Sequence, residues 1–365
     1  MEEIFSIIQF LKQAVKTGAS DEHLMVGHAP YLRINGFIKK ANANVLTKED
    51  IDSAILDIAP TNIRDKILTL HDVDFMYEIK GCSRFRINYN RQIGMPALVI
   101  RNIPYQIPNL KDLSLPDILS SVIEAQNGII LVTGPTGSGK STTIASLIDY
   151  INETRGKHVI TIEDPIEYVF DSKKSIISQR QVGIDTKSFA DGIKFSLRQD
   201  PDVIFIGEIR DKETMAAALK ASETGHLVLS TLHTNDAVQT INRIVNMFDE
   251  ANRIIIRKQL AETLRATIAQ KLVYSTKNEK RYPACEVMVV TSTVKDYLTK
   301  DNLDAIYDVL RDSNAENMVT MNTSLASLVN SELITQEEAL QNSNDIPELE
   351  KIFRGVYLGT KGYYE

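Results

Sequence analysis

Apolar residues recur with two different spacings along the chain, and the change between them divides it. In residues 1–18 they fall every three or four positions, which predicts an amphipathic helix. The next segments predict, in order, strands at 21–27 and 30–36, helices at 46–60 and 61–70, and a hairpin formed by 75–81 and 83–90. We expect a small α+β domain over residues 1–104.

A proline-rich stretch follows this domain. Residues 102–116 contain Pro104, Pro108 and Pro116, which remove backbone donors and favour extended geometry in the residues before them. A chain of 365 residues also exceeds the size at which one hydrophobic core keeps growing. We therefore interpret residues 105–116 as a linker between two domains.

Residues 117–365 show continuous apolar runs that alternate with amphipathic segments. The runs cover 128–134, 158–164, 202–208 and 226–232, with helices expected near 139–153, 188–199, 211–223 and 236–247. Such runs are typical of strands buried on both faces of a parallel sheet, so we predict a doubly wound α/β domain. Beyond Glu250 the pattern is mostly helical, with one strand expected at 284–290.

The segment GPTGSGKS, residues 134–141, lies between the first of these strands and a helix. Glycines there allow backbone N–H groups to converge on phosphates at the positive end of the helix dipole. Lys140 is expected to neutralise phosphate oxygens, and Ser141 to offer its hydroxyl to Mg²⁺. We therefore predict an ATP and Mg²⁺ site whose nucleotide-binding residues are Gly134, Pro135, Thr136, Gly137, Ser138, Gly139, Lys140, Ser141 and Thr142.

Acidic residues follow two other predicted strands. Glu208 comes directly after the run 203–206, at the strand end where doubly wound sheets bind ligands, and is the candidate catalytic base. The aspartate that usually holds magnesium is missing at position 207, and Asp202 is too early on the strand to replace it. Glu163, after the run 158–162, is a second candidate for metal and water positioning. The predicted metal site is thus Ser141, Glu163 and Glu208, although either acid could instead be an ordinary solvated side chain.

Histidines flank a further predicted strand. His233 follows it and is a candidate sensor of the γ-phosphate, whereas His226 precedes it, just after Gly225, which is expected to cap a helix. A single histidine is more often structural than catalytic, so both interpretations stay open for each of them.

Composition narrows the class of protein. Apolar residues make up 43% and charged residues 24% of the chain, and no apolar run is long enough to span a membrane. The acidic N-terminus does not resemble a signal or transit peptide, so a cytoplasmic location is expected. Cys82 and Cys285 are isolated, which disfavours disulfides and a four-cysteine zinc site. The net charge of −7 argues against a nucleic-acid partner.

Four motifs resemble those of the secretion-type ATPases, and within them the type IV pilus retraction branch: GPTGSGKST, ITIEDPIEY, LRQDPDVIFIGEIRD and GHLVLSTLHT. The resemblance covers nearly the whole chain and implies a RecA-like P-loop NTPase domain preceded by a PAS-like domain. It also implies a homohexamer in which nucleotide lies between the two domains and neighbouring subunits. Arg86 and Arg101 match the family's phosphate-contacting arginines; Arg84 is a second candidate, and Arg91 is a weaker one.

The resemblance further implies a role in pilus disassembly and twitching motility. The expected partners are a PilC-like platform protein in the inner membrane and a paralogous pilus ATPase, with the chain peripheral at the cytoplasmic face. A four-cysteine insert and a long extra N-terminal domain, found in assembly and type II secretion ATPases, are missing, which favours retraction.

One segment departs from the retraction branch. Residues 292–300, STVKDYLTK, replace the branch's C-terminal AIRNLIRE signature. An accessory PilU-like role, an assembly or secretion ATPase, a RecA-like nucleic-acid translocase and a nucleotide-binding scaffold without turnover therefore remain as alternatives.

Overall fold

The computed structural model describes residues 5–103, 105–312 and 318–355. The ends of the expected domains at positions 1, 104 and 365 lie outside these ranges. The chain separates into two compact units, Met1–Gln106 and Ile107–Glu365. The division falls inside the segment 105–116. From Ile107 onward that segment packs against the second unit, where the Ser146 hydroxyl donates to the Pro108 carbonyl at 2.7 Å.

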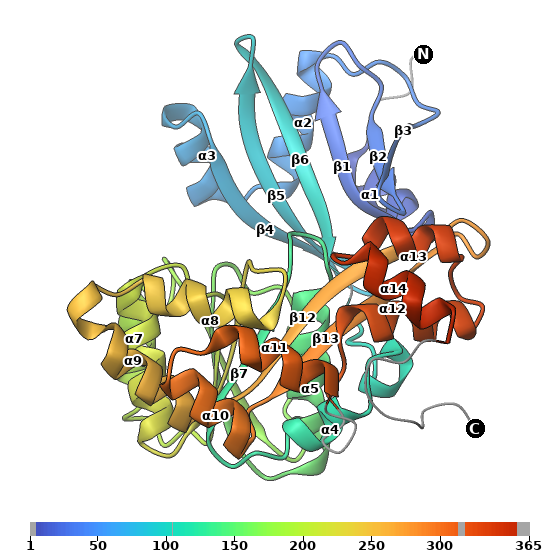
Figure 1. Ribbon diagram of the computed structural model, residues 1–365. Helices are drawn as coiled ribbons and strands as arrows, with labels where there is room; N and C mark the ends of the chain where they lie inside the picture. The colour runs from blue at the N-terminus through green and yellow to red at the C-terminus, as the bar shows by residue number, and fades with distance from the viewer. Residues whose placement is uncertain (1–4, 104, 313–317, 356–365) are drawn as a thin grey trace. The chain divides into compact units, whose positions relative to one another are not determined.

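The N-terminal unit is an antiparallel sheet with helices on one face (Figure 1). Its elements are α1 (Ile7–Lys16), β1 (Ala19–Met25), β2 (Tyr31–Ile34), β3 (Phe37–Lys40), α2 (Lys48–Ile58), α3 (Thr61–Thr69), β4 (Val73–Ile79), β5 (Ser83–Gln92) and β6 (Met95–Ile103). The described strands lie in the order β3-β2-β1-β6-β5-β4. The expected α+β domain and its β4–β5 hairpin are confirmed, while β3 and β6 were not foreseen.

Alternation along β5 separates the two faces of this sheet. Phe85 and Ile87 are fully buried against the apolar residues of α1 and α2, whereas Arg84 and Arg86 point to the opposite face and are half-buried. The start of α2 is fixed by a capping box in which Thr47 and Asp50 bond each other's backbone N–H groups. Local sequence therefore sets both the helix start and the buried face.

The second unit contains a seven-stranded sheet in the order β13-β12-β7-β11-β10-β8-β9. Its elements are η1 (Leu110–Leu113), α4 (Ile118–Val122), β7 (Gly128–Thr133), α5 (Lys140–Thr154), β8 (His158–Glu163), β9 (Ile176–Gln181), α6 (Phe189–Ser196), β10 (Val203–Ile206), α7 (Lys212–Glu223), β11 (Leu227–Leu232), α8 (Ala237–Asn246), α9 (Glu250–Thr263), β12 (Leu264–Ser275), β13 (Lys280–Val289), α10 (Ser292–Thr299), α11 (Leu303–Asp312), α12 (Met321–Asn330), α13 (Gln336–Asn342) and α14 (Ile346–Phe353). Neighbouring strands from β12 to β9 are parallel, and β13 is antiparallel to β12.

Both faces of this sheet are covered. Ile129 and Leu131 of β7 pack with α6 to α11 on one face, and Ile130 and Val132 pack with α4 and α5 on the other. Every residue of β7, β10 and β11 is buried, whichever face of the sheet it points to. The continuous apolar runs therefore correspond to central parallel strands, as expected.

The C-terminal part differs from the expectation of one strand among helices. β12 is a second strand, paired with β7 on one side and β13 on the other. Beyond it, α12 to α14 pack with Val273 and Ala284 in a separate small core. The unusual segment 292–300 forms α10, whose Val294 and Leu298 are buried, so its predicted helical character is confirmed. Among the helices of the described ranges, none combines the length and apolar character that a membrane crossing needs.

Candidate functional site

Four adjacent parallel strands bring most of the predicted site residues to one edge of the second sheet. The strands β7, β11, β10 and β8 are neighbours in that order. Their carboxyl ends lead directly into Gly134, His233, Gly207 and Asp164, respectively. Since parallel strands end at the same edge, the phosphate loop, His233, Glu208 and Glu163 lie together. The opposite edge carries Asp202, which bonds Lys157 and the His158 backbone.

The loop between β7 and α5 has the backbone that a phosphate cradle requires. Gly134, Gly137 and Gly139 have φ values of 143°, 79° and 89°, which are strained for residues with a side chain. The α5 helix begins at Lys140, so the N–H groups of its first turn have no partner within the helix. These groups and the helix dipole together favour an anion in the loop.

Lys140 is held over this loop by two carbonyl groups. Its Nζ donates to Gly134 O at 2.8 Å and to Pro135 O at 2.9 Å. Burial lowers the pKa of Lys140, while the nearby charges of Glu167 and Glu208 raise it. Burial disfavours the charged ammonium group, and nearby negative charge favours it. A bound phosphate would therefore stabilise the charged form of Lys140 further.

The side chain of Gln270, on β12, forms hydrogen bonds with the phosphate loop and with the first turn of α5. Gln270 is buried; its Nε2 donates to Ser138 O at 2.7 Å, and its Oε1 accepts from Thr143 Oγ1 at 2.8 Å. A Cβ added to Gly134 would lie 2.3 Å from Gln270 O, and one added to Gly139 would lie 2.8 Å from Gln270 Nε2. Gln270 was not among the predicted residues, because the strand that carries it was not recognised.

The loop residues fit a nucleotide phosphate. The Ser138 hydroxyl is buried and has no hydrogen-bond partner among the described residues. A Cβ at Gly137 would meet nothing within 4 Å, so open space lies beside the loop there. A phosphate oxygen in this space could accept hydrogen bonds from the unpaired Ser138 hydroxyl and from the buried Lys140 ammonium group.

Glu208 lies between two basic side chains. It forms an ion pair with Arg210, and its Oε2 lies 3.6 Å from His233 Nε2. Burial and the Lys140 charge lower the pKa of His233, with Glu208 acting in the opposite direction. The lowered pKa favours the neutral form of His233, whose imidazole can donate or accept a hydrogen bond beside Glu208.

Glu163 is enclosed rather than solvent-exposed. Its Oε1 accepts from Thr161 Oγ1 at 2.6 Å and from Gln179 Nε2 at 3.2 Å, and its Oε2 accepts from Glu167 N at 3.4 Å. Burial raises its pKa to about 7. The carboxyl group thus holds the segment that follows β8. From the same segment, Tyr168 contacts Thr142 of α5 through their hydroxyl groups, 3.0 Å apart.

The candidate metal residues Ser141, Glu163 and Glu208 remain a prediction. Within the described ranges, no group of three or more His, Cys, Asp or Glu side chains could hold a metal ion. A dedicated cage is not what Mg²⁺ needs beside a nucleotide, since it retains waters and uses substrate phosphates as ligands. The Ser141 position in the first turn of α5, next to the cradle, is compatible with that chemistry.

Arg84, Arg86 and Arg101 lie on the face of the N-terminal sheet opposite its helices, whereas Arg91 alternates to the face of Phe85 and Ile87. Arg86 on β5 is directly opposite Arg101 on β6. Arg101 Nε donates to Asp21 Oδ1 at 2.9 Å, and Arg91 Nε donates to the Tyr89 hydroxyl at 3.0 Å. Arg84 lies farther along β5, opposite Ile103.

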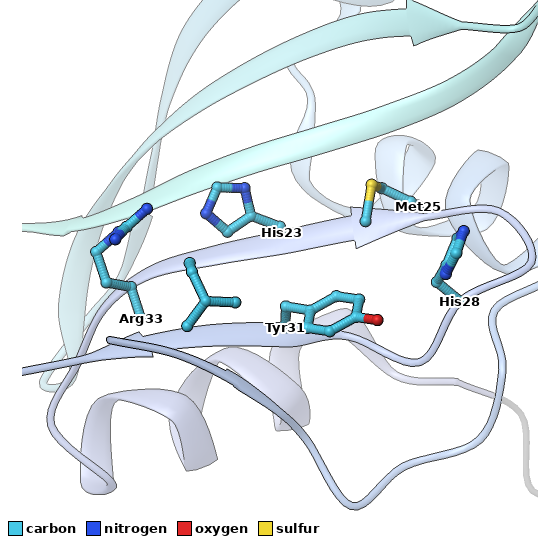
Figure 2. A pocket seen from close by; sticks show the side chains of 6 residues that line it. His23, Met25, His28, Tyr31 and Arg33 are labelled. Carbon is cyan, nitrogen blue, oxygen red and sulfur yellow. The ribbon is translucent and has the colours of Figure 1, made fainter. Parts of the chain in front are cut away.

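The same face also carries a hollow that sequence reasoning missed. This cavity of about 430 Å³ is lined by His23, Met25, His28, Tyr31, Arg33 and Ile38, which come from β1, β2, β3 and the loop after β1. Figure 2 shows how the first five of these side chains lie around it. Among the second unit's histidines, His226 lies at the amino end of β11, away from the phosphate loop. Its Nδ1 is 2.9 Å from Ala221 O, which supports the structural interpretation of that residue.

A phosphate loop at the carboxyl edge of a parallel sheet, with an acid and a histidine on the neighbouring strands, defines a P-loop NTPase. Comparison with known proteins identifies the family of P-loop NTPases to which the chain belongs. The family model described as type II/IV secretion system protein matches residues 4–345. The chain belongs to that family, among the PilT/PilU-type pilus ATPases.

Three relatives support the assignment. The type IV pilus retraction ATPase PilT of Pseudomonas aeruginosa is 38% identical over 343 residues, which are 94% of this chain and 99% of that protein. The type IV pilus ATPase PilU of the same organism is 34% identical over 341 residues, 93% of this chain and 89% of that protein. A crystal structure of the pilus retraction motor PilT with bound ADP has a TM-score of 0.86 at 43% identity, covering 95% of this chain and 99% of that chain.

These comparisons confirm the predicted fold class, a RecA-like domain preceded by a PAS-like α+β domain, and the predicted enzyme class. The chain is a nucleotide-binding ATPase of the pilus retraction and twitching motility family. The roles assigned to individual side chains remain predictions.

Proposed function

We propose that the chain hydrolyses ATP to power the retraction of type IV pili. The observation that carries this proposal is the match to PilT over nearly the full length of both proteins, in sequence and in fold. The phosphate cradle around Lys140, with Glu208 and His233 beside it, supplies the site for hydrolysis.

ATP with Mg²⁺ is the proposed cofactor pair. The bound ADP in the PilT crystal structure supports an adenine nucleotide in the cradle of residues 134–142. Ser141 would bind the metal together with phosphate oxygens, and Glu208 would take up the proton of the attacking water. His233, neutral beside Glu208, would respond to the γ-phosphate. Glu163 would order the adjoining segment and its water.

The motor is proposed to be a homohexamer at the cytoplasmic face of the inner membrane. Arg86 and Arg101 would neutralise charge that develops on the nucleotide phosphates, as arginine side chains do in other phosphoryl-transfer enzymes. Closure and reopening of the nucleotide sites around the ring would move a PilC-like platform protein and extract pilin subunits. The net charge of −7 suits a basic cytoplasmic surface on that partner, so docking is expected to weaken as salt is added.

The direct test is a deletion strain complemented with wild type, Lys140→Ala or Lys157→Ala. Lys157 is the matched control, because it pairs with Asp202 at the opposite edge of the same sheet. We expect the deletion and Lys140→Ala strains to carry many pili and to lose twitching, and the wild-type and Lys157→Ala strains to twitch. A strain without pili would instead assign the chain to assembly.

A second candidate is the accessory PilU-like role, which two observations favour. Identity to PilU, at 34% over 93% of the chain, is close to the identity to PilT. In addition, α10 carries STVKDYLTK in place of the expected signature, and its Lys295 pairs with Glu262 of α9 at 2.5 Å. An accessory enzyme would leave twitching intact on soft surfaces after deletion and reduce it only under load.

A further inference from the structure

Four charged side chains form a row across the open face of the N-terminal sheet. Arg86 on β5 is opposite Arg101 on β6, Arg101 is opposite Asp21 on β1, and Asp21 is opposite Arg33 on β2. The row therefore contains three arginines and a single carboxylate. Like charges directly opposite each other are destabilising, so the Arg86–Arg101 pair is maintained against a local cost.

Asp21 is a fixed acceptor within this row. Its Oδ1 accepts from Arg101 Nε at 2.9 Å, and its Oδ2 accepts from the Ser20 hydroxyl at 2.9 Å. Arg33 Nε lies farther away, 3.7 Å from Oδ2. The Asp21 side chain is only 12% exposed, so the residues packed around it restrict the conformations it can adopt.

The contact with Asp21 uses only the Nε of Arg101 and leaves the terminal nitrogens available for a phosphate. Asp21 takes Nε, and the two terminal nitrogens form no hydrogen bond with the described residues. The Arg101 side chain is 49% exposed, so these nitrogens remain accessible. A guanidinium fixed at Nε still presents donors in a rigid planar fork, the geometry that binds a phosphate oxygen best.

The other face of the same strands is also fixed. Asn102, next to Arg101, donates from Nδ2 to Glu22 Oε1 at 2.7 Å and to Ala19 O at 2.6 Å. Consecutive residues therefore tie β1 to β6 on both faces, Asp21 to Arg101 above and Glu22 to Asn102 below. The backbone that carries Arg101 is held in place together with its side chain.

We propose that Asp21 is a positioning residue for ATP hydrolysis, which holds the Arg101 guanidinium in the orientation that stabilises the transferred phosphate. This inference rests on the proposed role of Arg101 toward the nucleotide. Misplacing one charged group by about 1 Å costs as much as 10²-fold in rate, so a buried carboxylate that sets its orientation contributes to turnover without touching substrate.

The test is a double-mutant cycle on the full-length protein, with steady-state ATPase kinetics as the readout. The variants are Asp21→Ala, Arg101→Ala and the double variant, with Asp21→Asn as a milder change that preserves shape. Asp52→Ala is the matched control, because Asp52 pairs with Lys48 on the exposed surface of α2. The midpoint of thermal unfolding and the oligomeric state are measured for each protein.

We expect Asp21→Ala to lower kcat about tenfold with less than a threefold change in KM for ATP, and to have less than a twofold effect when Arg101 is already alanine. Asp21→Asn is expected to lie between wild type and Asp21→Ala, and Asp52→Ala to stay within twofold of wild type. An equal effect of Asp21→Ala in both backgrounds would overturn the inference. If Arg101→Ala alone had full activity, the role of that arginine would fail as well, while retraction itself would still be judged by the deletion strain.

Discussion

At the scale of single residues, the site depends on polar groups whose partners lie far away in the sequence. Gln270 reaches the phosphate loop from a strand more than a hundred residues later, and its two bonds satisfy Ser138 O and Thr143 Oγ1. Removing the amide would leave both buried groups without a partner, and each unsatisfied group costs about 1–3 kcal/mol. The loop that must bind phosphate through its backbone would then shift.

Gln270→Ala is therefore expected to lower kcat/KM for ATP about tenfold and to reduce thermal stability. Steady-state kinetics and the midpoint of unfolding measure the two effects. Gln126→Ala, on the exposed surface before β7, is the control and should change neither quantity. Wild-type kcat/KM in Gln270→Ala would contradict the bracing role.

A second residue-scale prediction concerns pH. Glu22 is fully buried, and burial raises its pKa to about 8 from an ordinary value of 4.5. Because the folded state favours the protonated form, the stability that Glu22 contributes is complete below about pH 4.5 and is lost as pH rises towards 8. The loss is at most about 1.4 kcal/mol per pH unit.

Glu22→Gln removes this titration while keeping the shape of the side chain. The midpoint of thermal unfolding, compared between variant and wild type from pH 5 to pH 8, should shift in favour of the variant as pH rises. Glu49→Gln, an exposed change on α2, gives the background. A difference that stays constant with pH for Glu22→Gln would show that Glu22 is not protonated in the folded protein.

At the scale of elements, the β5–β6 turn has an unsuitable residue. Gln92 pairs with Met95, so Ile93 and Gly94 form a two-residue turn in which both have positive φ, 53° and 75°. Such turns favour Asn-Gly, whereas a β-branched residue in this conformation costs roughly 1–2 kcal/mol. Ile93 is fully exposed, so its side chain gains no burial in return.

Ile93→Asn is expected to stabilise the N-terminal unit by about 1 kcal/mol, seen as a higher midpoint of thermal or denaturant unfolding. The control is Ile176→Asn, another exposed isoleucine, which lies in β9 with extended backbone and should give no gain. If Ile93→Asn lowered the midpoint, the positive φ at this turn would be wrong.

Elements with a clear period were predictable, and those whose neighbours decide their structure were not. The apolar runs of β7, β10 and β11 identified central strands, and the motifs after them located the phosphate loop, Glu208 and His233. In contrast, β12 follows α9 without glycine or proline between them, is rich in helix formers and is buried on both faces. Its strand structure comes from pairing with β7 and β13.

The same reason explains which parts of the site were missed. Gln270 lies on β12, and Asp21 is 80 residues from Arg101, so only the register of the sheets brings either one to its partner. The sequence motifs identify the residues that contact nucleotide. They do not identify the residues that hold those groups in place.

At the scale of the whole molecule, the ATPase site in the second unit is proposed to drive mechanical work on a pilus. The chain is an ATPase of the type II/IV secretion family, and we propose that its hydrolysis of ATP drives a motor. If hydrolysis by this chain drives retraction, the speed of retraction must depend on its turnover number. An accessory or regulatory chain would not impose that dependence.

The most direct measurement is therefore the retraction velocity of fluorescently labelled single pili in cells whose sole copy of the gene is wild type, Gln270→Ala or Lys140→Ala. We expect the velocity to fall in proportion to the kcat of each purified protein, and Lys140→Ala to give no powered retraction. Wild-type velocity in cells that carry a variant with strongly reduced kcat would contradict this expectation.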